Sequence, residues 1–266
     1  MTARNDFPTL GEVEALAREA GAAAMRYFRH NDRLEMHNKL NDSDIVTTAD
    51  KESEELITGY IRTHYPAHAI LSEESGETAG TSGCRWVIDP VDGTTNFFSG
   101  LPAWAISIGV EREGRTELGV VFLPALGEMF SAERGKGAWL NGAPIRVSGQ
   151  TALSRSVIAT GFPVDKDTNP DNNLDNLAAI LPLVRDIRRL GSAATELCYT
   201  AAGFFGVYWE LNLHEWDVNA GTLILEEAGG ICTRFRHDRG VSVVCGAPAI
   251  HDRLLPLLSR TPRVRP

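Results

Sequence analysis

Two stretches near the start of the chain repeat apolar residues at helical spacing. The first covers residues 10–28, and Thr9 with Glu12 three positions later forms a capping-box pattern at its start. The second begins near Thr48 and continues to about residue 64. These patterns predict a pair of amphipathic helices, with a polar stretch over residues 31–44 between them.

The spacing changes after residue 69, where apolar residues gather in short runs between Gly, Pro and Asp. Some of these runs alternate with polar residues and others are continuous. Such runs are typical of strands that lie between tight turns. They predict a mainly antiparallel sheet with strands at residues 70–71, 86–88, 103–110, 119–122 and 129–132.

The second half of the chain mixes the two periods. We expect strands at residues 157–158, 187 and 207–211, and helices at 174–184, after 191, from 217 to a glycine pair at 229–230, and at 254–258. Grouped strands and paired helices predict an α+β fold built in layers. A soft boundary near residue 150 would separate residues 1–150, with the helix pair and the antiparallel sheet, from a mixed half over residues 151–266.

Composition narrows the possible classes of function. The chain has 266 residues, of which 43% are hydrophobic, so it can form a substantial core. Its formal net charge of −9 argues against general binding to nucleic acid, which depends on Lys and Arg. The first thirty residues contain neither an apolar signal core nor a run that could span a membrane, so we expect a cytoplasmic protein without a membrane partner.

The four cysteines are widely spaced and include no CxxC pair. Zinc binding and redox chemistry usually require such close pairs. Free cysteine commonly behaves as a small hydrophobic residue. We therefore expect buried thiols at Cys84, Cys198, Cys232 and Cys245.

The densest cluster of candidate ligands directly follows one of the predicted strands. Asp89 and Asp92 lie three positions apart, with Pro90 between them, and can converge on hard cations that require oxygen ligands. Gly93 and Thr94 then provide flexible backbone and free N–H groups at an expected helix start, where anions bind readily. A turn and a helix cap explain the same residues, so the cluster alone leaves both interpretations open.

Three further acids have an ordinary explanation when each is taken separately. Glu73 fits a solvated loop after a strand, Asp217 fits a helix N-cap, and Asp50 fits the first turn of a helix. A site with several carboxylates and a phosphate-holding helix start explains all of them together. That combination indicates metal-assisted hydrolysis of a phosphate ester.

Four motifs, in this order, resemble the signatures of the inositol monophosphatase family. They are Ser-Glu-Glu-Ser at 72–75, Asp-Pro-Val-Asp-Gly-Thr-Thr-Asn at 89–96, Trp-Asp-Val-Asn-Ala-Gly at 216–221 and Glu-Ala-Gly-Gly at 227–230. The resemblance extends from Lys39 to the last predicted helix. It implies a layered α-β-α-β-α sandwich of the inositol monophosphatase and sugar phosphatase type, a magnesium-dependent and lithium-sensitive phosphatase, and a homodimer.

The resemblance also implies where two to three Mg²⁺ ions bind. One ion would be held by Glu73, Asp89 and the backbone carbonyl of Val91. A second would be held by Asp89, Asp92 and Asp217, so that Asp89 bridges the two ions. A third would lie near Glu73.

Catalytic and substrate-binding positions follow from the same resemblance. The family's nucleophile is a metal-bound water aligned by a threonine and an aspartate, which correspond to Thr94 and Asp50, and Glu73 is also assigned to catalysis. Glu210 is the expected specificity residue, because a carboxylate can accept hydrogen bonds from vicinal hydroxyls. Lys39 corresponds to a family lysine near the active site, although a solvated charge explains it equally well. The expected substrate contacts are Asp92, Gly93, Thr94, Gly191, Ser192, Ala193, Glu210 and Asp217.

Inositol monophosphate is the expected substrate within the wider class of small phosphorylated polyols and amino alcohols. Histidinol phosphate is the main alternative with the same mechanism, and fructose 1,6-bisphosphate is a third. Nucleotide-directed relatives usually have lysine where Thr95 stands, so 3′-phosphoadenosine phosphatase activity ranks lower.

A different class of function is a protein-interaction role in transcription regulation, as in some bacterial relatives. Arg185, Arg188 and Arg189 form a small basic cluster, which a solvated strand or a subunit interface also explains. The stretch over residues 204–207 is apolar where bacterial relatives often carry an arginine and an acid. It predicts a more apolar rim or dimer surface at that place.

Overall fold

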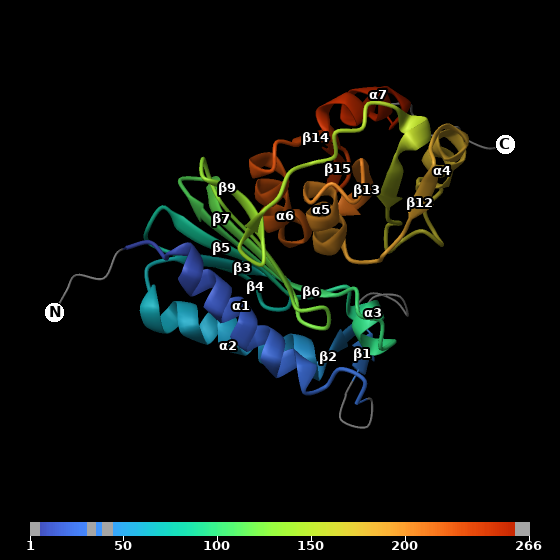
Figure 1. Cartoon of the computed structure of the whole chain (residues 1–266). Coiled ribbons are helices and arrows are strands. Elements are labelled where there is room, and N and C mark those ends of the chain that lie inside the picture. Colours follow the sequence, from blue (N-terminus) through green and yellow to red (C-terminus); the bar gives the residue numbers. More distant parts are fainter. Residues whose placement is uncertain (1–5, 31–35, 39–44, 259–266) are drawn as a thin grey trace.

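The structure is a computed structural model that describes residues 6–30, 36–38 and 45–258 of the chain. Its elements form five layers: a helix pair, a large sheet, a second helix pair, a smaller sheet and an outer helix layer (Figure 1). Three apolar clusters fill the spaces between these layers. This arrangement confirms the predicted layered α-β-α-β-α sandwich.

The first layer comes from the N-terminal residues. Its elements are α1 (Leu10–Met25), α2 (Thr48–His64) and a short strand pair, β1 (Met36–Asn38) and β2 (Ile45–Thr47). The predicted capping box is present: the Thr9 hydroxyl accepts from the Glu12 N–H at 3.3 Å, and the Glu12 carboxylate accepts from the Thr9 N–H at 2.8 Å. Both predicted helices are confirmed, and α2 begins at the expected residue.

Eight strands form the large sheet in the order β10-β9-β8-β7-β6-β5-β3-β4. All neighbouring pairs are antiparallel except β3 with β5, which confirms a mainly antiparallel sheet. Strands β4, β9 and β10 were not predicted. The bounds are β3 (Ala69–Ser72), β4 (Gly76–Thr78), β5 (Cys84–Asp92), β6 (Ala105–Arg112), β7 (Arg115–Leu123), β8 (Glu128–Glu133), β9 (Gly137–Leu140) and β10 (Ala143–Pro144), and the short helix α3 (Thr94–Phe98) follows β5.

Strand β6 presents large side chains to one helix layer and small ones to the other. Ile106, Ile108 and Val110 belong to the core under α1 and α2, where burying a side chain of this kind stabilises the fold by about 1.5–3 kcal/mol. The alternate positions are occupied by Ser107 and Gly109. The second face of the sheet therefore leaves room for a helix at close range.

Paired glycines allow α6 (Glu215–Glu227) to lie directly on that second face. Gly109 of β6 is opposite Gly119 of β7. A Cβ at Gly109 would overlap the Asn219 side chain, and a Cβ at Gly119 would lie 2.7 Å from the Ala220 carbonyl oxygen. The two glycines thus bring a helix from the second half of the chain against the first sheet.

The second sheet has the order β12-β11-β13-β15-β14. Strands β12, β11 and β13 are parallel, whereas β13, β15 and β14 pair antiparallel. The elements of this half, besides α6, are the 3₁₀ turns η2 (Leu153–Arg155) and η3 (Leu181–Leu183), the strands β11 (Val157–Thr160), β12 (Asp186–Arg188), β13 (Val207–Leu213), β14 (Ile231–Arg236) and β15 (Val241–Gly246), and the helices α4 (Leu174–Ile180), α5 (Ala193–Ala201) and α7 (Pro248–Leu258).

The helix expected over residues 174–184 is shorter than predicted. Helix α4 ends at Ile180, and the following 3₁₀ turn contains Pro182. Proline lacks an N–H and its ring clashes with the preceding helical turn, so the α-helical pattern stops here. The apolar spacing continues through this turn, so the sequence predicts a longer helix than the structure has.

Two of the four cysteines are not thiols, so the expectation for them was wrong. Cys232 of β14 and Cys245 of β15 stand directly opposite each other and form a disulfide. Cys84 and Cys198 are free and buried, as expected. The pairing depends on the register of two strands, which the spacing of cysteines along the chain does not reveal.

The large sheet ends with β10 and the second sheet begins with β11, so the change of sheet falls near residue 150. Helices α5 and α6 nevertheless share one apolar cluster with strands of both sheets. The division into residues 1–150 and 151–266 as two domains therefore stays a prediction. None of the helices within the described residues is long and apolar enough to cross a membrane.

Candidate active site

The end of β5 turns two predicted metal carboxylates to the same face of the large sheet. Residues three apart on a regular strand point to opposite faces. Asp89 pairs with Ser107 and Asp92 pairs with Ala105, so β5 contains one extra residue between its two acids. Pro90, which cannot donate to the sheet, lies within this bulge. The bulge is the reason that both carboxylates project toward α6.

Helix α6 supplies the third carboxylate. Asp217 lies in its first turn and accepts from the His214 N–H at 2.6 Å in a capping-box arrangement. One carboxylate oxygen from each of Asp89, Asp92 and Asp217 lies within 4.8 Å of the others. Asp217 is therefore both a helix-capping residue and a member of the acidic cluster.

Burial and charge repulsion raise the pKa of the cluster's buried members. Asp89 and Asp92 are 2% and 7% exposed. Loss of hydration raises the pKa of Asp89 well above 3.8, and the charge of Glu73 adds to this shift. Loss of hydration and then the charge of Asp217 raise the pKa of Asp92 to about 7.

The cluster fits divalent cations by the chemistry of its donors. In the part of the chain that the structure describes, no Lys or Arg forms an ion pair with these three carboxylates. The His214 ring nitrogen lies 3.7 Å from Asp217, and carboxylates buried this close together repel one another and are costly to ionise. Hard cations such as Mg²⁺ prefer carboxylate oxygens and supply the missing positive charge.

Glu73 reaches the cluster from the turn between β3 and β4. Its N–H donates to the Ile88 carbonyl oxygen at 3.2 Å, one residue before Asp89. A side-chain hydrogen bond between Glu73 and Asp89 contributes to the raised pKa of Asp89. The structure thus brings together all four carboxylates that the sequence predicted as metal ligands.

Thr94 and Asp50, the predicted catalytic pair, lie side by side. The Thr94 hydroxyl lies 3.2 Å from Asp50 Oδ1 and 3.1 Å from the Val91 carbonyl oxygen, so both oxygens compete for its single hydrogen. Asp50 is fully buried in the first turn of α2 and also accepts from the Thr47 N–H at 2.9 Å. The Val91 carbonyl, a predicted metal ligand, therefore belongs to the same network.

Asp92 also connects β5 to a helix of the second half. Its carboxylate accepts from the Ser192 hydroxyl, from the Ala194 N–H at 2.8 Å and from the Ala193 N–H at 3.3 Å. These donors lie at the start of α5, so Asp92 satisfies N–H groups that the helix itself cannot pair. Two predicted substrate contacts, Ser192 and Ala193, are thereby bonded to a predicted metal ligand.

The predicted phosphate and hydroxyl contacts meet where two loops touch. Gly93 has a positive φ of 87°, and a Cβ there would lie 3.1 Å from the Gly191 carbonyl oxygen. Glycine fits both the backbone angle and the close approach. The side chain of Asn96 donates to the carbonyl oxygens of Ala103 at 2.6 Å and Leu190 at 2.7 Å, which fixes the two loops against each other.

Glu210, the predicted specificity residue, lies on β13. Its carboxylate accepts from the Tyr208 hydroxyl at 2.5 Å and lies so close to Gly161 that a Cβ there would overlap it. Burial, with a smaller contribution from the charge of Asp217, raises the pKa of Glu210 to about 8, although the hydrogen bond from Tyr208 acts in the opposite direction. Glu210 is therefore electrostatically linked to the metal cluster.

Four buried polar residues support the site and were not predicted from the sequence. They are Ser53, Glu54, Asn96 and Glu196. The Ser53 hydroxyl donates to the Pro90 carbonyl oxygen at 3.1 Å, and the Glu196 carboxylate accepts from the Leu190 N–H at 2.6 Å. Only Asn96 lies inside a recognised motif, whereas the others occupy ordinary-looking polar positions in helices.

The remaining sequence candidates are a lysine, a basic cluster and an apolar stretch. Lys39 lies outside the described residues. Arg185, Arg188 and Arg189 are all exposed, and a Cβ at Gly191 would lie 2.5 Å from the Arg189 guanidinium. In the apolar stretch over residues 204–207, only Phe204 is exposed, at 55%.

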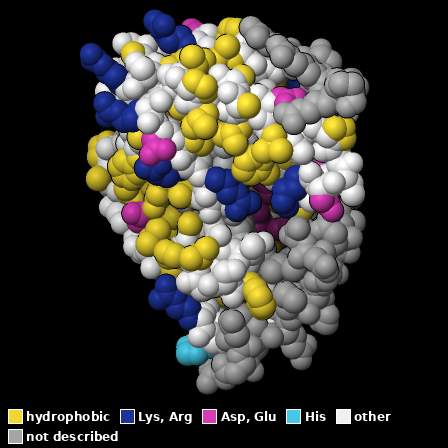
Figure 2. All heavy atoms as spheres, turned by 90° about the vertical axis from the view of Figure 1, so that its right-hand side faces the viewer, with side chains coloured by type: hydrophobic (Ala, Val, Ile, Leu, Met, Phe, Trp, Pro, Cys, Tyr) yellow, Lys and Arg dark blue, Asp and Glu magenta, His cyan; other side chains and the backbone are white. Residues whose placement is uncertain are grey.

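The side of the molecule with α3, α4 and β12 contains an acidic hollow (Figure 2). Acidic side chains lie at its bottom, basic side chains lie beside it, and hydrophobic side chains cover much of the surrounding surface. Leu174, Leu181 and Leu183 of α4 and η3 are among the exposed large hydrophobic residues. This face therefore contains a hollow with acidic side chains at its bottom and hydrophobic side chains around it.

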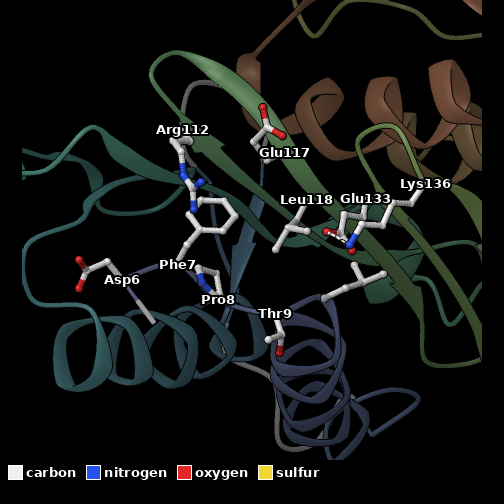
Figure 3. Close-up of a pocket in the computed structure, with 10 residues that line it drawn as sticks. Asp6, Phe7, Pro8, Thr9, Arg112, Glu117, Leu118, Glu133 and Lys136 are labelled. Atoms are coloured by element: carbon white, nitrogen blue, oxygen red, sulfur yellow. Dashed lines mark ion pairs between the residues drawn. The ribbon is translucent and has the colours of Figure 1, made fainter. Parts of the chain in front are cut away.

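A separate cavity of about 460 Å³ lies at the other end of the large sheet (Figure 3). Its lining includes residues 6–10 and Arg112, which pairs with the start of β5 rather than with its acidic end. Arg112 lies over the Phe7 ring at 4.1 Å, and Lys136 pairs with Glu133 at 2.6 Å. None of the predicted site residues lines this cavity, so the candidate chemistry belongs to the carboxylate cluster.

The raised pKa values predict that the metal-free protein loses stability as the pH rises. Between pH 3.8 and about 7, folded Asp92 binds more protons than unfolded Asp92, so the free energy of unfolding falls by up to about 1.4 kcal/mol per pH unit for this group. Mg²⁺ would replace those protons and stabilise the folded state by mass action. The melting temperature with EDTA should fall from pH 5 to pH 8, and Mg²⁺ should raise it more at pH 8.

An Asp92→Asn variant provides the control for this experiment. It removes the titrating carboxylate, so its melting temperature should depend less steeply on pH in the presence of EDTA. It should also respond less to Mg²⁺ at pH 8. A wild-type protein whose melting temperature at pH 8 is indifferent to Mg²⁺ would contradict the metal assignment.

The sequence is similar to that of known proteins along nearly the whole chain. The model of the Inositol monophosphatase family matches residues 9–262. The Nus factor SuhB of Pasteurella multocida (strain Pm70) is 41% identical over 253 residues, which cover 93% of this chain and 94% of that protein.

Two solved structures have the same fold over almost their full length. The extragenic suppressor protein suhB from Bartonella henselae has a TM-score of 0.87 at 35% identity, over 94% of this chain and 98% of that chain. The inositol monophosphatase from Anabaena (Nostoc) sp. PCC 7120 has a TM-score of 0.83 at 36% identity, over 96% and 98%. The chain therefore belongs to the inositol monophosphatase family.

Proposed function

We propose that this chain hydrolyses inositol monophosphate to inositol and phosphate in a magnesium-dependent reaction. Its family is one of magnesium-dependent phosphatases, and the Anabaena relative is named an inositol monophosphatase. The observation that carries the proposal is the convergence of Asp89, Asp92 and Asp217 within 4.8 Å, beside the Thr94–Asp50 pair.

The proposed metal ligands are the carboxylates of the cluster with the carbonyl oxygen at the end of β5. Asp89, Asp92 and Asp217 would hold one Mg²⁺, and Glu73 and Asp89 with the Val91 carbonyl would hold another; a third would lie near Glu73. Bound there, Mg²⁺ would neutralise phosphate oxygens and make a water molecule more acidic. The buried carboxylates keep this charge away from bulk solvent, where it would be screened.

The chain's own residues would orient the reacting groups. Asp50 can accept the hydrogen bond that the Thr94 hydroxyl donates, which leaves the Thr94 oxygen free to accept a hydrogen bond from an attacking water. The backbone N–H groups of Gly93 and Thr94, at the start of α3, would hold the phosphate. In this proposal no side chain becomes phosphorylated.

Glu210 would select the alcohol part of the substrate, together with residues 191–193. The position of its carboxylate, fixed by Tyr208 and Gly161, favours recognition of hydroxyl groups by hydrogen bonds. Histidinol phosphate, with an amino group, and fructose 1,6-bisphosphate remain the alternative substrates for the same mechanism.

Phosphate release from a panel of substrates tests the proposal. We expect magnesium-dependent hydrolysis of inositol 1-phosphate to exceed that of histidinol phosphate, fructose 1,6-bisphosphate and 3′-phosphoadenosine 5′-phosphate. A higher kcat/KM for histidinol phosphate would be consistent with the same mechanism but would make histidinol phosphate the preferred substrate. No magnesium-dependent release from any member of the panel would overturn the proposal.

A Glu210→Gln variant should change substrate preference more than it changes the chemical step. At pH 9, above the raised pKa of Glu210, we expect kcat/KM for inositol 1-phosphate to fall by about 10-fold to 100-fold, because a hydrogen bond to a charged group contributes about 1.5–3 kcal/mol. Hydrolysis of p-nitrophenyl phosphate, which has no vicinal hydroxyls, should fall much less. Equal losses on both substrates would contradict the specificity role.

A second candidate function is a protein-interaction role in transcription regulation. The observation that favours it is the name of the Pasteurella relative, a Nus factor, at 41% identity. One variant distinguishes the two functions. Asp217→Asn should lose phosphatase activity, whereas binding to a protein partner should be unaffected. Restoration of a SuhB-deletion phenotype by this inactive variant would favour the interaction role.

We also propose a homodimer, inhibition by lithium and a cytoplasmic location, as the sequence resemblance implies. The exposed leucines of α4 and η3 support a dimer, because hydrophobic side chains cover much of this face (Figure 2) and exposed apolar patches often mark an interface. Light scattering with Leu181→Glu tests this: the wild type should have the mass of two chains and the variant that of one. Turnover that is indifferent to millimolar lithium would contradict the inhibition.

A further inference from the structure

Helix α2 carries three buried polar residues on one turn of its surface. Asp50, Ser53 and Glu54 have exposed fractions of 0%, 0% and 6%. Spacings of three and four residues place them next to one another on the helix. The same helix also buries Ile57 and Ile61 in the core beneath the large sheet. Three polar groups in such a place require partners, because unpaired buried polar groups are costly.

The partners of Glu54 lie on both sides of Glu73. The Ser72 hydroxyl donates to Glu54 Oε2 at 2.6 Å, and the Glu74 N–H donates to the same oxygen at 3.0 Å. Ser72 pairs with Gly76, so Glu73 and Glu74 belong to the tight turn between β3 and β4. One buried carboxylate therefore holds the residues before and after a proposed metal ligand.

The carboxylate of Glu54 is buried. Among the described residues, no Lys, Arg or His forms an ion pair with it. Burying an acid against two hydrogen-bond donors is a costly way to secure a turn. The arrangement is understandable if the position of the turn matters more than its contribution to stability.

The neighbouring residue links the same helix to the other metal-binding segment. The Ser53 hydroxyl donates to the Pro90 carbonyl oxygen at 3.1 Å, between Asp89 and the Val91 carbonyl. One turn of α2 thus contacts both segments that supply ligands to the ion proposed at Glu73, Asp89 and the Val91 carbonyl. The distance between those segments is set by a single rigid element.

We propose that Glu54 is a positioning residue that holds Glu73 in place for Mg²⁺ binding. This inference rests on the proposed metal-dependent function. Glu54 itself acts through the Ser72 hydroxyl and the Glu74 N–H, and the shape of the turn then directs Glu73 toward Asp89. The important property of Glu54 is a fixed oxygen acceptor rather than its charge.

The test compares Mg²⁺ binding by calorimetry with the Mg²⁺ dependence of phosphate release. Glu54→Leu keeps the approximate size but removes the acceptor, and it should raise the dissociation constant for Mg²⁺ about 10-fold or more. Glu54→Gln keeps an oxygen acceptor and should stay within about 3-fold of wild type. Should Glu54→Leu fail to fold, Ser72→Ala removes one of the two donors and should give a smaller shift in the same direction.

Two controls separate positioning from general destabilisation. Ile57→Ala, on the same helix and fully buried, should lower the melting temperature without changing Mg²⁺ affinity. In a Glu73→Gln background, Glu54→Leu should have little further effect on Mg²⁺ affinity, because its target is already altered.

The outcomes distinguish this inference from the proposed function. Wild-type Mg²⁺ affinity in Glu54→Leu, an equal loss in Ile57→Ala, or an equal loss in Glu54→Gln would overturn the positioning role. Absence of Mg²⁺ binding to the wild type would overturn it as well. If the wild type binds Mg²⁺ but hydrolyses none of the phosphates tested, the proposed substrate class fails while the calorimetric result for Glu54 still holds.

Discussion

Replacing Asp217 by asparagine should lower magnesium-dependent phosphate release by at least about 10³-fold, equivalent to about 4 kcal/mol of transition-state stabilisation. The carboxylate lies within 4.8 Å of Asp89 and Asp92, so the substitution removes one negative charge from the proposed ion site. Asparagine keeps an oxygen that can accept from the His214 N–H, as Asp217 does at 2.6 Å. The fold should therefore remain intact, and the loss should come from the chemistry.

Glu215→Gln is the matched control for this variant. Glu215 lies two residues earlier in the same helix, and its carboxylate pairs with Arg85 at 2.9 Å outside the cluster. The same change from carboxylate to amide should leave turnover within about 2-fold of wild type, because exposed ion pairs contribute little. Circular dichroism and melting temperature should match for both variants. Wild-type turnover in Asp217→Asn would show that the cluster is not the metal site.

The sequence predicts the strong elements of this fold because their signals are local. The capping box of Thr9 and Glu12 locates the start of α1, and continuous apolar runs locate the central strands. Short strands at the edges, such as β4 and β10, have too few residues for a recognisable period. The helix over residues 174–184 was overestimated because its apolar pattern continues through Pro182.

The predicted site residues converge, but the devices that bring them together are not visible in the sequence. A motif identified Asp89 and Asp92, whereas the bulge that turns both to one face depends on the pairing of β5 with β6. The glycine pair of β6 and β7 that admits α6 depends on strand register as well. The disulfide between Cys232 and Cys245 was missed for the same reason.

Buried carboxylates with structural partners form the other class that the sequence does not reveal. Glu54 and Glu196 occur within helical patterns, where an acid ordinarily faces solvent. Their burial follows from what packs against the helix. Asp92 was expected to bind metal, but its hydrogen bonds to the start of α5 were not predicted. They depend on how the two halves of the chain pack together. Long-range packing, rather than local propensity, determines these roles.

Replacing Thr94 by valine should reduce kcat by about 10²-fold to 10³-fold while leaving Mg²⁺ affinity nearly unchanged. Valine has nearly the same shape but lacks the hydroxyl that lies 3.2 Å from Asp50 Oδ1. No carboxylate is removed, so the charge of the cluster is preserved. Thr94→Ser keeps the hydroxyl and should retain activity within about 5-fold. The measurements are kcat at saturating Mg²⁺ and the Mg²⁺ concentration that gives half of that rate.

A double-mutant cycle with Asp50→Asn shows whether the two residues act as one unit. Asparagine can still accept from the Thr47 N–H, so the start of α2 should keep its cap. If Thr94 and Asp50 orient the same water, the double variant should be no slower than the slower single variant, because either change already breaks the unit. Multiplicative losses would mean that the two side chains act independently. Asp50 would then contribute through the capping box of α2 rather than through the Thr94 hydroxyl.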